Sequence, residues 1–288
     1  MDAAFAWALA ATLMAGVQVF VQKIVAHEGR DSALNGIFGY GLSGVGAAAI
    51  FFLFYDLPEL WLPILLIASV SGTVHAVGSY VRIESLKFID TVIYFPINKV
   101  LGPILVVITG VWWFGEILTL TQYLGIAFSI TVPLLLVSSS EHHRQRNLRL
   151  GLVLLVISTV LTSLTSPFMK ASLNLDETLF FSMLVGQFTG TFASIVLYAY
   201  LKRKERQYFS LHARDIELGV ITGFLQFVSF YAFLMALSMG YLSIVYVIHA
   251  HYILVPIILS VWWYREHINM RKFAAIVVSS AAITLLGL

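Results

Sequence analysis

The sequence predicts an all-α membrane protein with ten transmembrane helices, arranged as two inverted five-helix repeats. Three observations predict this fold class: the composition, ten long apolar segments, and a match between the two halves of the chain. Of the 288 residues, 59% are hydrophobic and only 11% are charged, and the mean hydropathy is +0.90. Because soluble domains carry about 25% charged residues, this composition excludes a soluble fold.

Ten segments approach the length of about 20 mostly apolar residues that a helix needs to cross the hydrocarbon layer. They are residues 5–26, 33–54, 60–81, 91–114, 118–137, 150–169, 179–201, 216–236, 242–264 and 273–286. Their apolar character is continuous, whereas the strands of a membrane barrel alternate over about ten residues. The sequence therefore favours helices.

A single polar run at mid-chain, SSSEHHRQRNLR at 138–149, divides the ten segments into two sets of five. We therefore expect a first five-helix repeat over residues 1–140, a joint over 141–149 and a second repeat over 150–288. The joint is expected to face the cytoplasm.

The two halves match at more than one register. VWWFGE at 111–116 and VWWYRE at 261–266 lie 150 residues apart, and an offset of 151 aligns SGTVHAVGSY (71–80) with TGFLQFVSFY (222–231). Because each copy holds an odd number of helices, the two copies must enter the membrane from opposite sides.

The basic residues support this inversion. Of the 17 Lys and Arg residues, all but Lys99 and Lys170 fall in connections that share one membrane face. By the positive-inside rule, that face is cytoplasmic. We therefore expect a multi-pass protein of the cytoplasmic (inner) membrane with both termini outside.

The two acidic residues that end the matching hexapeptides, Glu116 and Glu266, lie at the ends of spans, where an acid costs little. We interpret them as structural turn or helix-start groups. The neighbouring Trp pairs, 112–113 and 262–263, are typical of the aromatic belts at membrane interfaces.

The GE pair at Gly115–Glu116, the RE pair at Arg265–Glu266 and the helices with Pro96, Pro103 and Pro256 before them resemble the drug/metabolite transporter (DMT) superfamily. The closest likeness is to its EamA-type bacterial members, and it covers essentially the whole chain. Two features depart from the family pattern: Arg265 stands where Gly is usual, and cytoplasmic termini are the more usual orientation.

The resemblance implies a secondary transporter that works by alternating access around a central cavity lined by the first, third, fourth, sixth, eighth and ninth helices. Inverted repeats independently favour a substrate site near the midplane, where helices are interrupted. We expect such interruptions at Pro96, Pro103 and Pro256, because each proline removes a backbone donor.

Lys99, inside the fourth span, is the strongest candidate for substrate binding, and the offset of 150 pairs it with His249 in the ninth span. A charge near the bilayer centre costs at least a few kcal/mol unless it meets a partner or water. No acidic residue lies deep in any span, which favours an anionic substrate group as the partner of Lys99. The alternative is a lysine that snorkels or forms a structural ion pair.

Two histidines are candidates for proton coupling, because histidine changes charge near neutral pH. His249 and His251 lie about 200° apart around a helix, so we do not expect both to face one cavity. The repeat favours His249. A purely structural, hydrogen-bonded role remains an alternative for each histidine.

Five further residues complete the candidate lining. His75 and Gln226 occupy matching positions in stripes of small residues on the third and eighth helices, and the alternative for these stripes is a helix-packing seam. Tyr80 and Tyr231 could form cavity walls or interfacial aromatics. Gln18, on the first helix, lies near the level of Thr165 on the sixth.

The sequence therefore predicts a secondary transporter that exports a small polar metabolite, such as an amino acid or another carboxylate or anionic compound. The alternatives are efflux of lipophilic compounds, which calls for an intramembrane carboxylate that is missing, and a non-transporting structural subunit, which gives Lys99 no purpose. We expect no enzymatic activity, because no HExxH, GxSxG or acidic pair lies within a span.

The expected partners are the small-molecule substrate and the lipid bilayer, with proton coupling as an open alternative. We expect no cofactor and no metal, and the absence of Cys excludes thiolate sites and disulfides. The net charge of +2 gives no reason to expect nucleic-acid binding. A monomer and a homodimer are both compatible with the sequence.

Overall fold

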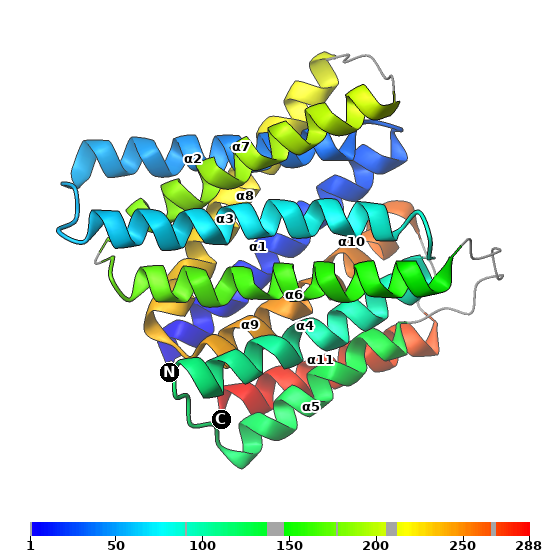
Figure 1. The fold of residues 1–288 in the computed structure, drawn as a ribbon. Helices are drawn as coiled ribbons and strands as arrows, with labels where there is room; N and C mark the ends of the chain where they lie inside the picture. Colours follow the sequence, from blue (N-terminus) through cyan, green and yellow to red (C-terminus); the bar gives the residue numbers. More distant parts are fainter. Residues whose placement is uncertain (1, 90, 137–146, 177, 206–211, 266–268) are drawn as a thin grey trace.

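The computed structural model of the chain describes residues 2–89, 91–136, 147–176, 178–205, 212–265 and 269–288 (Figure 1). The regular secondary structure of these residues is entirely helical. The helices are α1 (Asp2–His27), α2 (Ser32–Phe54), α3 (Trp61–Ser85), α4 (Thr91–Trp113), α5 (Leu120–Leu135), α6 (Leu148–Leu173), α7 (Phe180–Glu205), α8 (Ala213–Met239), α9 (Leu242–Ala250), η1 (His251–Ile253), α10 (Leu254–Tyr264) and α11 (Met270–Gly287).

Each of the ten predicted segments contains a helix, and the observed ends differ from the predicted ones by no more than four residues. Within the described ranges, nine helices are long and apolar enough to cross a membrane, with Leu242–Tyr264 counted as one. The tenth, α5, has 16 residues and is shorter than predicted. It begins only at Leu120 because Thr119 and Gln122 form a capping box there. The prediction of an all-helical, multi-pass membrane protein is confirmed.

Consecutive spans run in opposite directions, with α9, η1 and α10 as one span, and both termini lie at the same end of the bundle (Figure 1). The two halves of the chain interdigitate. α3 packs against α6 and α7, α8 packs against α1 and α2, and α5 packs against α11. The strongest contacts of most helices therefore cross between the halves, so neither half forms a bundle of its own.

Small residues let these helices approach closely. A Cβ at Gly72 of α3 would collide with the carbonyl oxygen of Gly186 on α7. The Ser71 hydroxyl donates to the Thr165 carbonyl at 2.9 Å. In lipid, where apolar surface gives little drive for association, such close packing and interhelical hydrogen bonds hold helices together. The packing-seam alternative thus describes these small residues of the stripe on α3.

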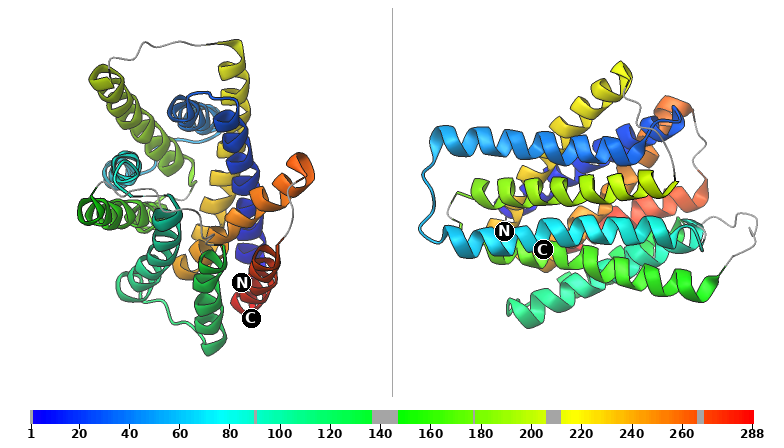
Figure 2. Two further views of the ribbon diagram at one scale, coloured as in Figure 1. Left: turned by 90° about the vertical axis from the view of Figure 1, so that its right-hand side faces the viewer. Right: turned by 45° about the horizontal axis from the view of Figure 1, so that its top comes forward.

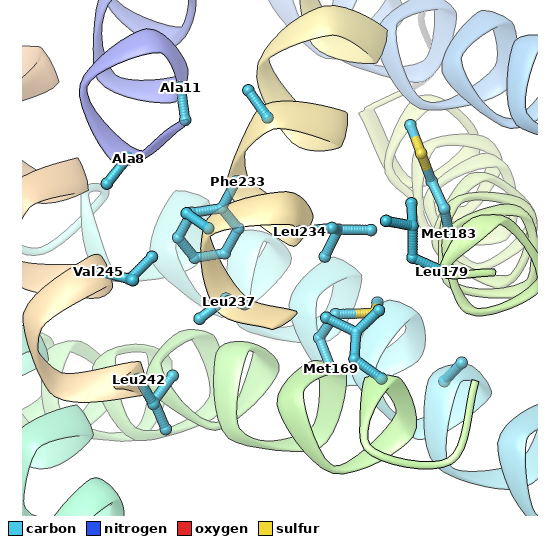
Figure 3. Packing of buried hydrophobic residues seen from close by; sticks show 14 of the residues in the cluster. Ala8, Ala11, Met169, Leu179, Met183, Phe233, Leu234, Leu237, Leu242 and Val245 are labelled. Atoms are coloured by element: carbon cyan, nitrogen blue, oxygen red, sulfur yellow. The ribbon is translucent and has the colours of Figure 1, made fainter. Parts of the chain in front are cut away.

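The main apolar core lies at the end of the bundle that carries the termini. Figure 3 shows part of its packing from close by. It is built from the first part of α1, α3, α7 and α9 and from the last part of α2, α4, α6, α8 and α11. Toward the opposite end, the apolar clusters are small and separate. The bundle is therefore most densely packed at the terminus-bearing end.

Ion pairs join the helices at the opposite end, which we call the basic end; the left view of Figure 2 looks onto this end. They connect the α1–α2 connection to the end of α7 and the start of α8. The pairs are Arg30–Asp215, Arg214–Glu28 and Lys202–Asp31, each at 2.9 Å, and Arg30 also pairs with Glu28 at 3.0 Å within the connection. Basic residues that are far apart in the sequence thus meet at one end of the bundle.

The span 242–264 is interrupted in its middle. Pro256 has no N–H to donate to the carbonyl of Tyr252, four residues earlier. Tyr252 lies in the 3₁₀ turn η1, which separates α9 from α10. The predicted interruption before Pro256 is confirmed. The predicted interruptions at Pro96 and Pro103 are wrong, because α4 continues through both residues. A single proline removes one hydrogen bond, which a packed transmembrane helix tolerates.

Candidate functional site

A contact between Lys99 of α4 and Tyr252 of η1 lies near the middle of both spans. Lys99 Nζ donates to Tyr252 Oη at 2.5 Å and lies 4.3 Å from the centroid of the same ring. The side chain of Lys99 is half-buried. Tyr252 therefore binds the ammonium group through both its hydroxyl and its ring face, but it brings no formal negative charge.

No carboxylate among the described residues pairs with Lys99. The ion pairs found there lie at helix ends, around Glu28, Asp31, Glu84 and Asp215. The cation–π contact with Tyr252 supplies only about 0.5–2 kcal/mol. The charge of Lys99 is thus only partly compensated by its described neighbours.

His249 and His251 shortly precede Tyr252 in the sequence and make different contacts. The ring of His249 lies 5.6 Å from that of Tyr252 and 4.6 Å from that of Phe233, between centroids. Its Nδ1 is buried and, in the described part of the chain, has no hydrogen-bond partner.

His251 lies beside Lys99 in another direction. Its Nδ1 is 2.8 Å from the Val247 carbonyl oxygen, while Nε2 is buried and has no partner among the residues described. Together with Lys99, Pro103 and Ser129, it lines a small cavity between α4, α5 and η1, and His249 is not part of that lining. The repeat favoured His249, but the 3₁₀ turn brings His251 to the cavity of Lys99.

A second group of polar side chains surrounds His75 of α3. The ring of His75 lies 5.5 Å from the ring of Tyr40 on α2, between centroids. Arg82 follows His75 by seven residues and so lies on the same face of α3.

Gln18 and Gln226 lie together, as Gln18 Nε2 on α1 donates to Gln226 Oε1 on α8 at 2.6 Å. Each amide therefore satisfies part of the hydrogen-bonding capacity of the other. No contact found among the described residues joins this pair to Lys99.

The two predicted tyrosines make their contacts away from Lys99. Tyr231 packs among Trp7, Phe180 and Phe227, with ring centroids at 5.8, 5.5 and 6.5 Å. Tyr80 packs edge-to-face against Tyr200 of α7 at 6.5 Å. For both residues, these contacts fit the interfacial or structural alternative better than a wall of the Lys99 site.

Sequence reasoning missed Tyr252 and Tyr40. Tyr252 follows His249 by three residues and so shares its helix face, which is a usable signal. Tyr40 carried no signal of its own.

Glu116 is buried and accepts three hydrogen bonds at the start of α9. The donors are the N–H of Leu242, the N–H of Ser243 at 3.0 Å and the Ser243 hydroxyl at 2.5 Å. Glu116 is thus a helix-start group, as predicted, but for a helix of the other half of the chain. Glu266 lies outside the described residues.

Lys170 holds the other side of the same connection. Its ammonium group donates to the carbonyls of Leu237 and Gly240, the latter at 3.1 Å. These carbonyls end α8, where the helix dipole favours a cation. A cation at the end of α8 and an anion at the start of α9 therefore hold this connection at the terminus-bearing end.

Comparison with known proteins adds the following. Residues 149–288 match the EamA-like transporter family. A crystal structure, described only as that of a protein, has a similar fold with a TM-score of 0.77 and 13% identity, over 99% of this chain and 96% of that one. No curated protein matches the chain. The resemblance inferred from the sequence is confirmed over the second half of the chain, and the structural likeness shows the fold alone.

Proposed function

We propose that this chain, whose residues 149–288 match the EamA-like transporter family of the DMT superfamily, carries a small anionic metabolite across the cytoplasmic membrane by alternating access. The family match supports a membrane transporter. The anionic substrate, the alternating-access mechanism and the cytoplasmic membrane are parts of the proposal. For the direction of transport, we propose export.

The observation that carries the proposal is the state of Lys99. Its ammonium group lies in the middle of a span, bound to Tyr252 and half-buried, and no described carboxylate neutralises it. Such a charge costs at least a few kcal/mol unless water or a counter-charge reaches it. A carboxylate or phosphate group of the substrate would supply that counter-charge. The same positive charge disfavours efflux of lipophilic cations.

The pairing of helices supports a ten-helix inverted repeat, which is the usual basis of alternating access. In the repeat, α3 corresponds to α8, α6 to α1 and α7 to α2. The packing of α3 on α6 and α7 therefore has its counterpart in the packing of α8 on α1 and α2. Gly115 and Arg265, at matching positions of the repeat, both adopt positive φ, 65° and 53°.

The uneven core also supports two alternating states. It closes the bundle at the terminus-bearing end and leaves only small apolar clusters at the basic end. We propose that the basic end is cytoplasmic and the termini are outside, so that this arrangement corresponds to an inward-facing state. Closing the basic end and opening the other would complete the cycle.

Proton coupling through His249 or His251 is part of the proposal. Both histidines have a buried ring nitrogen that no described group satisfies, and both lie near Lys99. A proton on either ring would add a positive charge beside Lys99 and so strengthen the binding of an anion.

Transport by the purified protein in liposomes tests the proposal. We expect Lys99→Gln to reduce exchange of small carboxylates and phosphorylated compounds at least tenfold, with unchanged expression and monodispersity. Lys87→Gln makes the same chemical change at the basic end, where Lys87 pairs with Glu84 at 2.9 Å, and serves as the control. Full activity of Lys99→Gln would remove Lys99 from the site and with it the basis for an anionic substrate.

A further inference from the structure

We infer that Ser163 of α6 and Tyr246 of α9 form a second binding group for the substrate beside Lys99, and that this group binds a hydroxyl. This inference rests on the proposed function, because it takes Lys99 as the residue that binds the anionic group. It narrows the substrate class to anions that also carry a hydroxyl, and it gives Gly102 of α4 a role in the site.

The first step is the seam between α4 and α6, where polar side chains meet in pairs. Tyr94 Oη and Ser158 Oγ lie 2.7 Å apart, and Asn98 Nδ2 donates to Thr159 Oγ1 at 2.9 Å. These side-chain bonds fix the rotation of α4 against α6 over the first part of both helices.

The next position along this seam holds a glycine opposite a serine. Gly102 and Ser163 follow Asn98 and Thr159 by four residues, so they lie on the same faces of α4 and α6. A Cβ on Gly102 would lie 3.5 Å from Ser163 Oγ and 3.5 Å from Tyr246 Oη of α9. Because Gly102 has no side chain, the two hydroxyl groups face the space over its Cα.

The second step is the state of the Ser163 hydroxyl. Ser163 lies close enough to Tyr246 to interact with it, but its buried Oγ has no partner within hydrogen-bond distance among the described residues. The neighbouring hydroxyls of Ser158, Thr159 and Thr162 each donate to a carbonyl of α6. A buried hydroxyl without a partner is unfavourable. A ligand group between Ser163 and Tyr246 would bridge the two hydroxyls and satisfy Ser163.

The third step is the position of Tyr246, which borders the interior of the bundle. α9 packs against α1, α4, α5, α6 and α8, so other helices surround it. Within residues 242–248, every residue except Tyr246 is buried. The exposed part of Tyr246 therefore opens into the bundle and not toward lipid.

The same helix faces lead to Lys99. His249 and Tyr252 follow Tyr246 by three and six residues, and Tyr252 is the partner of Lys99. On α4, Gly102 follows Lys99 by three residues, which is about 4.5 Å along the axis. Both steps lead toward the terminus-bearing end, since α4 runs toward that end and α9 begins there (Figure 1). The two hydroxyls therefore lie about one helix turn beyond Lys99.

The chemistry of these groups selects a hydroxyl. Serine and tyrosine hydroxyls both donate and accept, so a substrate hydroxyl can accept from one of them and donate to the other. An ammonium group at this place would be repelled by Lys99, one turn away. A spacing of one turn suits a hydroxyl about two to four carbons from the anionic group, as in a hydroxy acid or a glycerol phosphate.

Paired ligands test this inference by thermal stabilisation and calorimetry on the purified protein. 3-Hydroxybutyrate is compared with butyrate, 5-hydroxyvalerate with valerate, and glycerol 3-phosphate with propyl phosphate. The members of a pair share the anionic group and the carbon chain and differ in hydroxyl groups. We expect the wild-type protein to bind at least one hydroxylated ligand about fivefold tighter than its partner, or more, which is the gain from one good hydrogen bond.

Gly102→Ala is the sharpest variant, because it keeps both hydroxyls and fills the space between them and α4. Contacts of 3.5 Å are ordinary for a Cβ, so the variant should fold. We expect it to remove the advantage of the hydroxylated ligands and to leave the others within about twofold, since it changes no charge. Gly36→Ala on α2, where a Cβ would meet nothing within 4 Å, is the matched control and should change neither.

Three further variants separate the two binding groups. Ser163→Ala and Tyr246→Phe each remove one hydroxyl, so each should reduce the advantage of the hydroxylated ligands. Lys99→Gln removes the charge and should weaken both members of every pair.

The outcomes are distinguishable. Equal binding within every pair by the wild type, or an advantage that survives Gly102→Ala, would overturn the hydroxyl-binding group and leave the proposed function standing. If none of the anions binds, with or without a hydroxyl, the proposed function fails and this inference fails with it. A poorly folded Gly102→Ala would be recognised by its elution profile, and Ser163→Ala and Tyr246→Phe would then decide the question.

Discussion

Replacing Glu116 by alanine should weaken the connection between α8 and α9 at the terminus-bearing end. The carboxylate accepts from two backbone N–H groups, of Leu242 and Ser243, and from the Ser243 hydroxyl. These N–H groups belong to the first turn of α9, where no intrahelical acceptor exists. Without the carboxylate, both donors lose their described acceptor in a buried place.

The size of the effect follows from these contacts. A buried donor left without an acceptor costs about 1–3 kcal/mol, so two of them give about 2–6 kcal/mol. Loss of the anion at the start of α9 adds roughly 0.3–1 kcal/mol through the helix dipole. Glu116→Gln keeps one acceptor oxygen, so we expect it to lose about half as much as Glu116→Ala.

Reversible unfolding in mixed micelles measures the free energy of unfolding of each variant. Glu59→Ala is the matched control, because Glu59 is exposed in the connection between α2 and α3, at the same end of the bundle. We expect Glu59→Ala to stay within about 0.5 kcal/mol of the wild type. A Glu116→Ala protein as stable as this control would refute the role assigned to the carboxylate.

Two further predictions concern the basic end. Arg265 adopts a left-handed conformation, with φ of 53°, which costs a residue with a Cβ about 1–2 kcal/mol; Arg265→Gly should therefore raise the free energy of unfolding by about 1 kcal/mol, and an unchanged value would contradict this. Burial raises the pKa of Asp31, but hydrogen bonds from Lys202 and Tyr198 outweigh it and hold the pKa below the ordinary 3.8. Because a lowered pKa stabilises the ionised folded form, this contribution is fully present above pH about 4 and is lost as the pH falls through the folded pKa. Unfolding measured from pH 6 to pH 3 should show this loss in the wild type and a smaller one in Lys202→Ala; identical pH profiles would argue against the pairing.

The helices could be predicted because their cause is local. A run of about 20 apolar residues must satisfy its own backbone hydrogen bonds in lipid, so composition alone requires helices at these positions. The exception shows the limit of this reasoning: α5 is shorter than its apolar segment because the capping box of Thr119 and Gln122 fixes its start. The prolines of α4 were misjudged, since one missing hydrogen bond did not break the helix.

Lys99 could be found in the sequence because a charge within a span is conspicuous wherever its side chain points. Its neighbours could not, because contacts between helices depend on the rotation of each helix about its axis. One residue of displacement turns a side chain by about 100°. In spans that are apolar on all sides, hydropathy gives no preferred face, so Tyr252 and Tyr40 were not distinguished from other aromatic residues.

The sequence by itself determined that the chain is helical, that it crosses the membrane many times, that its basic residues gather at one end, and that Lys99 needs a counter-charge. Each of these properties depends on composition or on spacing along one helix. Only the tertiary structure decided that Tyr252 binds Lys99 and that Glu116 starts a helix of the other half. Those contacts join segments up to 153 residues apart, and they exist only because helix packing fixes the depth and rotation of each partner.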